Sequence, residues 1–164
     1  DAWEMNLDKE ANFIVPFHKL SQWLTYSLLL PITKLSDIQM TNTENMTGLP
    51  EYRNGGLFLD LGVITLKSNA LLAGLNRPEA NKADQIPAFN VHEQAIVEWR
   101  ALTVCLLDLV AEELRNRIGA TKEELTLPMV LEAGTWKAGR EIAAKLRPST
   151  KNPPITIISD GTVF

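Results

Sequence analysis

A short polar stretch in the first third of the chain has the residue types needed for acid–base chemistry. It reads EYRN at residues 51–54, with TGLP before it and a glycine pair after it. Glycine adopts backbone angles that other residues avoid and proline fixes one angle, so these flanks predict a shaped turn. The apolar run at residues 57–64 follows directly and should be buried. A carboxylate at the mouth of a buried element, here Glu51, is placed to serve as a general acid or base.

The structural alternative for this stretch is a turn without chemistry. Glu51 and Arg53 could pair with each other, or they could cap a helix, because turns of this composition are common. The residues of this stretch alone leave both interpretations open.

A second polar group recurs at helical spacing before this stretch. Lys19, Gln22 and Tyr26 lie at i, i+3 and i+7 and share one face of the helix expected at residues 17–30. That face is either a solvated flank or one wall of a cleft.

A third group lies on the long helix expected at residues 91–119. Glu98 shares a face with Leu102, which sets a carboxylate against an apolar neighbour. A buried carboxylate is costly unless it is paired, so we expect an ion pair with Arg100 or with Arg53. The functional alternative is that this pair holds the polar groups of a cleft in place. A fourth polar candidate, Asp160, lies in the C-terminal segment.

Composition excludes several classes of protein. With 45% hydrophobic and 22% charged residues, the chain of 164 residues is typical of a globular protein in water. Its net charge of −4 argues against a broad nucleic-acid-binding surface. A single cysteine rules out an internal disulfide and favours a reducing compartment, the cytoplasm, and with two histidines it offers no metal-ligand cluster. No apolar run approaches the length that spans a membrane.

Periodicity predicts a mainly α protein, a single helical domain with a central buried helix and a short β-type tail. The middle of the long helix is apolar almost all round, so this helix should be the buried centre, with Cys105 as a small core residue. Pro128 suits the first turn of a final helix that runs to about residue 146. That helix contains Gly134 and Gly139, at which close packing is expected.

The other expected segments follow from breakers and local period. They are a short helix or extended lead-in at 1–15, a helix at 17–30 ended by Pro31, a loop at 33–46, a short buried helix at 57–66, a loop at 74–90, a capping box at 121–124 and a β-type run at 155–158.

Five strings, in order along the chain, resemble the uracil-catabolism protein family of fungi and bacteria, which is usually labelled a domain of unknown function. They are PFHKLSQWL at 16–24, TGLPEYRNGGL at 47–57, VEWRALT at 97–103, LEAGTW at 131–136 and SDGTVF at 159–164. The resemblance covers residues 1–164 and implies the C-terminal part of a longer family member. The first residue, Asp1 rather than Met, fits that expectation.

A weaker resemblance reaches the queuosine-salvage family of nucleotide N-glycosidases, whose helical scaffold is similar to helix-hairpin-helix DNA glycosylases. That family carries Phe-x-Lys-x-x-Gln, Asp-Tyr-Arg, Val-Glu-x-Arg and a Trp-bearing helix in the same order. Lys19 and Gln22 match the first motif, and residues 51–53 match the second with Glu in place of Asp. Residues 97–100 match the third and Trp136 the fourth, whereas the family's His/Arg-rich ending is replaced by SDGTVF.

The resemblances imply hydrolysis of an N-ribosidic bond in uracil catabolism, with release of urea from a ribosylurea-type intermediate, free or 5′-phosphorylated. Departure of an N-linked group leaves oxocarbenium character on the sugar, and a carboxylate can stabilise it or activate water. Glu51 is expected to be this carboxylate, with Asp160 as the second candidate.

The other site residues are expected to bind substrate. Their expected roles are to orient Glu51 (Arg53, Glu98 and Arg100), to hold a sugar phosphate or hydroxyl (Lys19) and to form an apolar wall (Tyr52 and Trp136). Gln22 is expected to bind the substrate beside Lys19. The expected partners are the N-riboside or its phosphate and either the missing N-terminal portion or a second copy, without nucleic acid, membrane, metal or redox cofactor. The competing hypothesis is a non-catalytic helical scaffold or subunit of a larger uracil-catabolism assembly.

Overall fold

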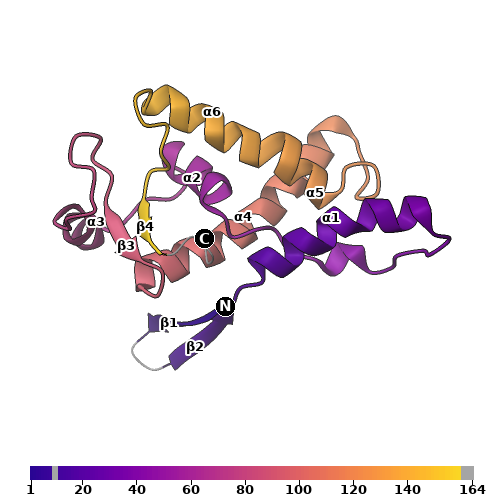
Figure 1. The fold of residues 1–164 in the computed structure, drawn as a ribbon, viewed down its shortest axis with the longest axis horizontal. Helices are drawn as coiled ribbons and strands as arrows, with labels where there is room; N and C mark the ends of the chain where they lie inside the picture. Colours follow the sequence, from indigo (N-terminus) through magenta and orange to yellow (C-terminus); the bar gives the residue numbers. More distant parts are fainter. Residues whose placement is uncertain (9–10, 160–164) are drawn as a thin grey trace.

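The computed structural model describes residues 1–8 and 11–159. The chain starts with an antiparallel hairpin of β1 (Ala2–Asp8) and β2 (Ala11–Pro16), which projects from the helical body (Figure 1). Asn6 N donates to Gln94 Oε1 and Gln94 Nε2 donates to Asn6 O, each at 3.0 Å, and these bonds tie the hairpin to the body. A short helix or an extended lead-in was predicted for residues 1–15, and the two strands show that the extended alternative is correct.

Helix α1 (Lys19–Leu35) continues past Pro31, so the prediction that this proline ends the helix is wrong. Proline has no N–H, which leaves the carbonyl of Ser27 without its helical partner. Ser27 is exposed, so water can take the place of that partner. Beyond the proline the Thr33 hydroxyl donates to the carbonyl of Leu29 at 2.9 Å, and the helix keeps its register.

Helix α2 (Tyr52–Asp60) follows a short 3-10 turn, η1 (Thr43–Asn45), and begins before the predicted helix at 57–66. It also ends earlier than predicted, at Asp60 instead of residue 66. The glycine pair interpreted as a turn flank lies inside α2. A Cβ on Gly55 would lie 2.5 Å from Thr103 Oγ1, so glycine here allows α2 to pack closely on the long helix. Close packing therefore overrides the low helix propensity of glycine.

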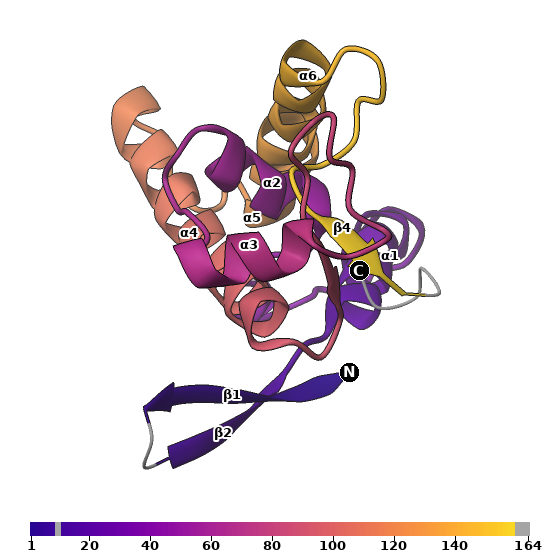
Figure 2. The same cartoon turned by 90° about the vertical axis from the view of Figure 1, so that its left-hand side faces the viewer.

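The segment predicted as a loop at 74–90 is more structured than expected. Helix α3 (Ser68–Leu75) ends inside it, and strand β3 (Ala88–Asn90) closes it. Strand β3 pairs in parallel with β4 (Thr156–Ile158), which confirms the β-type run near the C-terminal end. Figure 2 shows α3 and this small sheet together on one side of the body.

Helix α4 (Gln94–Ile118) is the long helix that the sequence predicts, and Gly119 ends it with a left-handed backbone at φ 70°. It is not buried all round. Thr103 and Leu107 are buried, whereas Leu102 lies on an exposed face. Cys105 is exposed as well, so its assignment to the core is wrong.

The final helix is continuous but irregular. It begins with the short turn α5 (Leu127–Met129), passes through a π-helix, η2 (Val130–Trp136), and ends as α6 (Lys137–Leu146). Close packing is confirmed at Gly139, where a Cβ would lie 2.0 Å from the carbonyl oxygen of Arg53 in α2. Gly134 has nothing within 4 Å of such an atom, so the same expectation is wrong there.

The capping box before this helix is confirmed. Thr121 N donates to Glu124 Oε2 at 2.9 Å, and Glu124 N donates to Thr121 Oγ1 at 3.2 Å. The two bonds satisfy donors that the start of a helical turn leaves unpaired.

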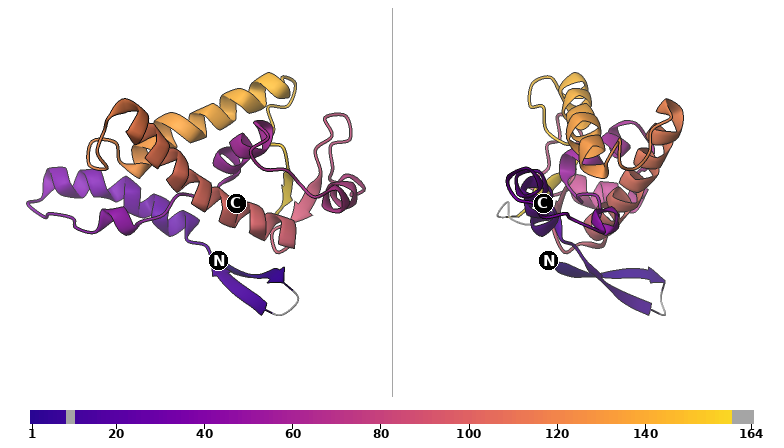
Figure 3. Two further views of the ribbon diagram at one scale, coloured as in Figure 1. Left: turned by 180° about the vertical axis from the view of Figure 1, so that it is seen from behind. Right: turned by 90° about the vertical axis from the view of Figure 1, so that its right-hand side faces the viewer.

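Two apolar clusters hold the elements together. The first joins the β3–β4 sheet to α4 through Phe89, Ile96, Trp99 and Ile155. The second joins α2, α4 and η2 through Phe58, Leu107 and Leu131. The back view in Figure 3 shows α4 crossing the body between the other helices. The fold is mainly helical, as predicted, and none of the helices in the described ranges is long and apolar enough to cross a membrane.

Candidate functional site

A cavity of about 290 Å³ opens between α1, the start of α2 and the final helix. The side chains that define it are Trp23 and Tyr26 of α1, Glu51 and Asn54 at the start of α2, and Glu132 and Trp136 of η2. Glu51 and Trp136 are the two predicted site residues on this wall. The cavity has the size of a site for a small molecule.

Glu51 is the N-cap of α2, so the helix-capping alternative is correct for this residue. Its carboxylate accepts a hydrogen bond from Asn54 N–H at 3.1 Å. Capping does not exclude a functional role, because the side chain is only 6% exposed and lies on the cavity wall. One glutamate thus satisfies the helix terminus and presents a carboxyl group to the cavity.

The surroundings of Glu51 favour its protonated form. Burial raises the pKa of Glu51 and outweighs the backbone N–H groups of Arg53 and Asn54, which lower it. The positive charges of Lys19 and Arg53 also lower this pKa. A carboxyl group with a raised pKa holds a proton closer to neutral pH, where acid–base catalysis uses it.

Asn54 fixes the position of this carboxyl group relative to the final helix. Its side-chain oxygen accepts a hydrogen bond from the Thr135 hydroxyl at 2.9 Å, and both residues are buried. The start of α2 is therefore linked to η2, the element that carries the opposite wall. Because polar groups buried together restrict one another, the cavity walls keep a fixed spacing.

Lys19 and Gln22 lie near the site but not on the cavity wall. Burial lowers the pKa of Lys19, and Arg100 lowers it further, whereas the charge of Glu51 raises it. Gln22 Oε1 is buried and accepts no hydrogen bond within the described ranges. The Lys-Gln-Tyr face thus forms the wall of a cleft only through Tyr26, whose hydroxyl donates to Thr47 O at 2.7 Å.

The expected ion pair of Glu98 with Arg100 or Arg53 is wrong. Glu98 accepts a hydrogen bond from Gln94 Nε2 at 2.7 Å. Arg100 is fully buried and pairs instead with Asp1, at 2.5 Å and 3.2 Å. Residues two apart on a helix point in different directions, so Glu98 and Arg100 do not meet. Burial lowers the pKa of Arg100 to about 10.

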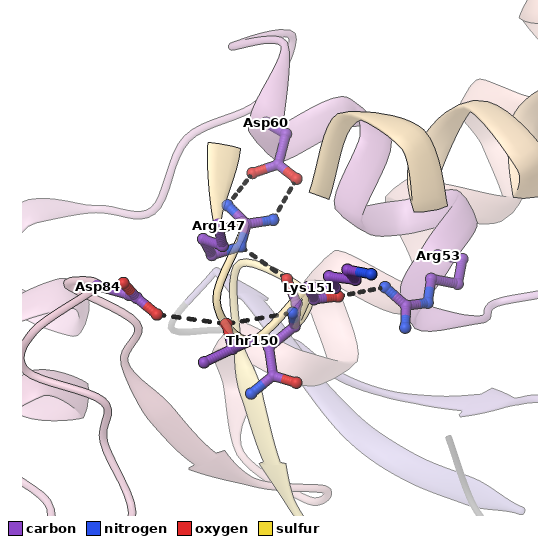
Figure 4. Close-up of polar contacts among 7 residues, drawn as sticks. Arg53, Asp60, Asp84, Arg147, Thr150 and Lys151 are labelled. Carbon is purple, nitrogen blue, oxygen red and sulfur yellow. Dashed lines mark hydrogen bonds and ion pairs between the residues drawn. The ribbon is translucent and has the colours of Figure 1, made fainter. Parts of the chain in front are cut away.

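Arg53 belongs to a different set of contacts (Figure 4). Its guanidinium donates to Lys151 O at 3.0 Å and lies 5.0 Å from the centre of the Tyr52 ring. Next to it Arg147 forms a two-pronged ion pair with Asp60, at 2.8 Å and 2.6 Å. These bonds hold the segment after α6 against both ends of α2, so the Arg53 guanidinium contributes to the fold. Asp160 lies outside the described residues.

Several residues of the wall were not predicted. Trp23, Asn54 and Glu132 are among them, and the helical face that Glu132 shares with Trp136 was the available signal. The Arg140 guanidinium lies 4.9 Å from the centre of the Trp136 ring and adds to the same face. Both cavity residues of this face lie in a π-helix, a rare geometry that is frequent at functional sites.

The wall therefore combines two carboxyl groups, on Glu51 and Glu132, with two indole rings, on Trp23 and Trp136. Carboxyl groups transfer protons and stabilise positive charge, and indole faces bind flat or weakly polar groups. Across the described ranges, no group of three or more His, Cys, Asp or Glu side chains is arranged to hold a metal ion.

Comparison with known proteins places this geometry in context. The family model described as "Protein of unknown function (DUF1688)" matches residues 1–164. The chain is 47% identical over 174 residues to "Uracil catabolism protein 4" of Lachancea kluyveri and 50% identical over 165 residues to "Protein urg3" of Schizosaccharomyces pombe. The alignments cover 100% of this chain but 39% and 37% of the two relatives, so the chain spans less than half of their length. No solved structure matches, and the likeness to glycosylase scaffolds stays a prediction.

Proposed function

The chain belongs to the DUF1688 family, and we propose that it acts in uracil catabolism by hydrolysing an N-ribosidic bond. The substrate is a ribosylurea, free or 5′-phosphorylated, and the products are urea and ribose or its phosphate. The name of the L. kluyveri relative supports the pathway. The observation that carries the reaction is the buried carboxyl group of Glu51, with its raised pKa, on the wall of a small cavity.

In this proposal Glu51 acts first as an acid and then as a base. Its carboxyl group donates a proton to the urea nitrogen as the C1′–N bond breaks, which leaves oxocarbenium character on the ribose. The carboxylate then takes a proton from the water whose oxygen bonds to C1′. One water is consumed and Glu51 returns to its protonated form, so atoms and charge balance.

The neighbouring residues support these two steps in different ways. Glu132 faces the same cavity, and its carboxylate stabilises the positive charge that develops on the sugar. Trp23 and Trp136 offer flat faces to the ureido group and the sugar. Lys19 is not on the wall, so it acts through Glu51 by favouring the carboxylate that forms between the steps.

The non-catalytic scaffold is the second candidate, and specific contacts favour it. Arg100, Arg53 and Glu98 all bond to other parts of the chain, which is the behaviour expected of structural polar groups. In that case the cavity would be a packing defect beside α2, and the only role of Glu51 would be to cap the start of that helix. The two candidates differ in whether the cavity binds a substrate.

Incubation with ribosylurea and with its 5′-phosphate separates the two candidates. Urea release is followed with this chain and with the full-length L. kluyveri relative, each at the same concentration. The hydrolase proposal predicts release by at least the full-length protein, and a preference between the two substrates identifies the sugar. Absence of urea from both substrates with the full-length protein would favour the scaffold.

A further inference from the structure

Helix α1 carries a stripe of leucines on the side that faces away from the body. Leu20, Leu24, Leu28 and Leu35 recur at i, i+4, i+8 and i+15, and they are between 45% and 87% exposed. The opposite side of the helix is the one that meets the body, where Gln22, Tyr26 and Leu29 are half-buried. The face that meets the body is partly polar, and the leucine stripe is an apolar face of α1 that the described chain leaves exposed.

The helix is also poorly supported for its length. It makes few contacts with the other elements of the described chain, and among its residues Lys19 alone is buried. In the front and back views its far end projects beyond α4 and α5 (Figures 1 and 3). Most of the stability of a protein helix comes from packing of its apolar face, so an outward leucine stripe of this length indicates a missing partner.

The relatives supply an occupant for this stripe. Each aligns with the whole of this chain yet is more than twice its length, so most of each relative has no counterpart here. We propose that the leucine stripe of α1 is the docking surface for an amphipathic helix from that remaining part of the family's polypeptide. The spacing of the stripe is that of one helix packed along another.

Docking on this surface would also affect the cavity. Trp23 and Leu30 flank the stripe on the side of the cavity, and both are more than half exposed. A helix laid along the stripe covers the Trp23 edge of the cavity wall and limits access of water from that side. The inference does not depend on the reaction proposed above, because it follows from the exposure of α1 and the length of the relatives.

Cysteine labelling of this chain and of the full-length L. kluyveri relative tests the inference. Leu24→Cys and Leu28→Cys are made in this chain and at the aligned positions of the full-length L. kluyveri relative, with native cysteines replaced by serine. Lys145→Cys, at an exposed position of α6, is the matched control. The rate of maleimide labelling is measured at several protein concentrations, together with the molar mass by light scattering.

The proposal predicts rapid labelling of all three sites in this chain. In the relative, at concentrations where light scattering gives the mass of a monomer, labelling at positions 24 and 28 slows by about tenfold or more while the control site stays rapid. Equal rates in the two proteins would overturn the proposal. Protection that depends on concentration and accompanies a dimer would overturn it too, because the occupant would then be a second copy.

Discussion

Glu51 at the start of α2 and Lys19 at the start of α1 are both buried, and the charge of each favours the charged form of the other. Burial acts against both charges, since it raises the pKa of Glu51 and lowers the pKa of Lys19. At both groups, burial therefore acts against the charge that the other group favours. A carboxyl group in this condition can both give and take a proton, which is the property that the proposed reaction uses.

Replacement of Lys19 tests this coupling. In Lys19→Met the positive charge beside Glu51 is lost, so the pKa of Glu51 should rise further above the ordinary glutamate value. Titration of the Glu51 carboxyl carbon by NMR measures the shift. Lys145→Met, which removes an exposed lysine of α6, should leave the titration unchanged. An unchanged Glu51 pKa in Lys19→Met would show that the two groups do not interact.

The pH dependence of stability follows from the raised pKa of Glu51. A glutamate whose pKa is higher in the folded protein than in the unfolded chain stabilises the fold in acid, and this contribution is lost as pH rises from the ordinary value through the raised one. Glu51→Gln cannot ionise, so it should lack this loss. Urea unfolding of both proteins between pH 4 and 8 measures the difference, which grows by at most ~1.4 kcal/mol per pH unit. Parallel curves for the two proteins would mean that the pKa is not raised.

The approach of α6 to α2 makes a prediction about two glycines. Gly139→Ala places a Cβ against the Arg53 carbonyl, where backbone must move, and should cost about 3 kcal/mol of unfolding free energy. Gly134→Ala meets nothing within 4 Å and should stabilise the helix by about 0.5–1 kcal/mol. Urea denaturation followed by circular dichroism measures both. Equal effects of the two substitutions would contradict the packing described here.

The ion pair between Arg147 and Asp60 should contribute much more than a surface pair. In Arg147→Ala the carboxylate of Asp60, whose side chain is 4% exposed, loses its partner and should destabilise the protein by about 3–5 kcal/mol. Glu113→Ala breaks the exposed pair with Arg117 and should cost no more than about 0.5 kcal/mol. Thermal unfolding of both variants provides the comparison, and a mild effect at Arg147 would argue against the buried geometry.

Local patterns in the sequence predict the parts of this fold that local forces decide. The long period ending in Gly119 predicts α4, and Thr121 with Glu124 predicts a capping box, because both depend on neighbouring residues. The start of α2 was not predicted because Gly55 is a poor helix former. This glycine allows close packing on Thr103, which lies far along the chain. Such contacts leave no local signal.

The site shows the same division. The strings that resemble the uracil-catabolism family correctly indicated the family, whose model matches the whole chain. The wall of the cavity depends on which helices pack together, so the spacing of Trp23 did not mark it as a wall residue. Glu132 shares a helical face with Trp136, but that face alone does not show which cavity it lines. Arg100 pairs with Asp1, which lies 99 residues away in the sequence. A local pattern around either residue does not predict such a pair.

Single-turnover release of urea from ribosylurea tests the role of Glu51 most directly. The comparison uses the full-length L. kluyveri relative as wild type, with Glu51→Gln and Glu112→Gln made at the aligned positions. Glu112, an exposed glutamate of α4 in this chain, is the matched control. The account predicts that Glu51→Gln still binds the substrate but releases urea at least about 100-fold more slowly, while Glu112→Gln equals the wild type. Release at the wild-type rate by Glu51→Gln would contradict the account, because the proton would then come from another group.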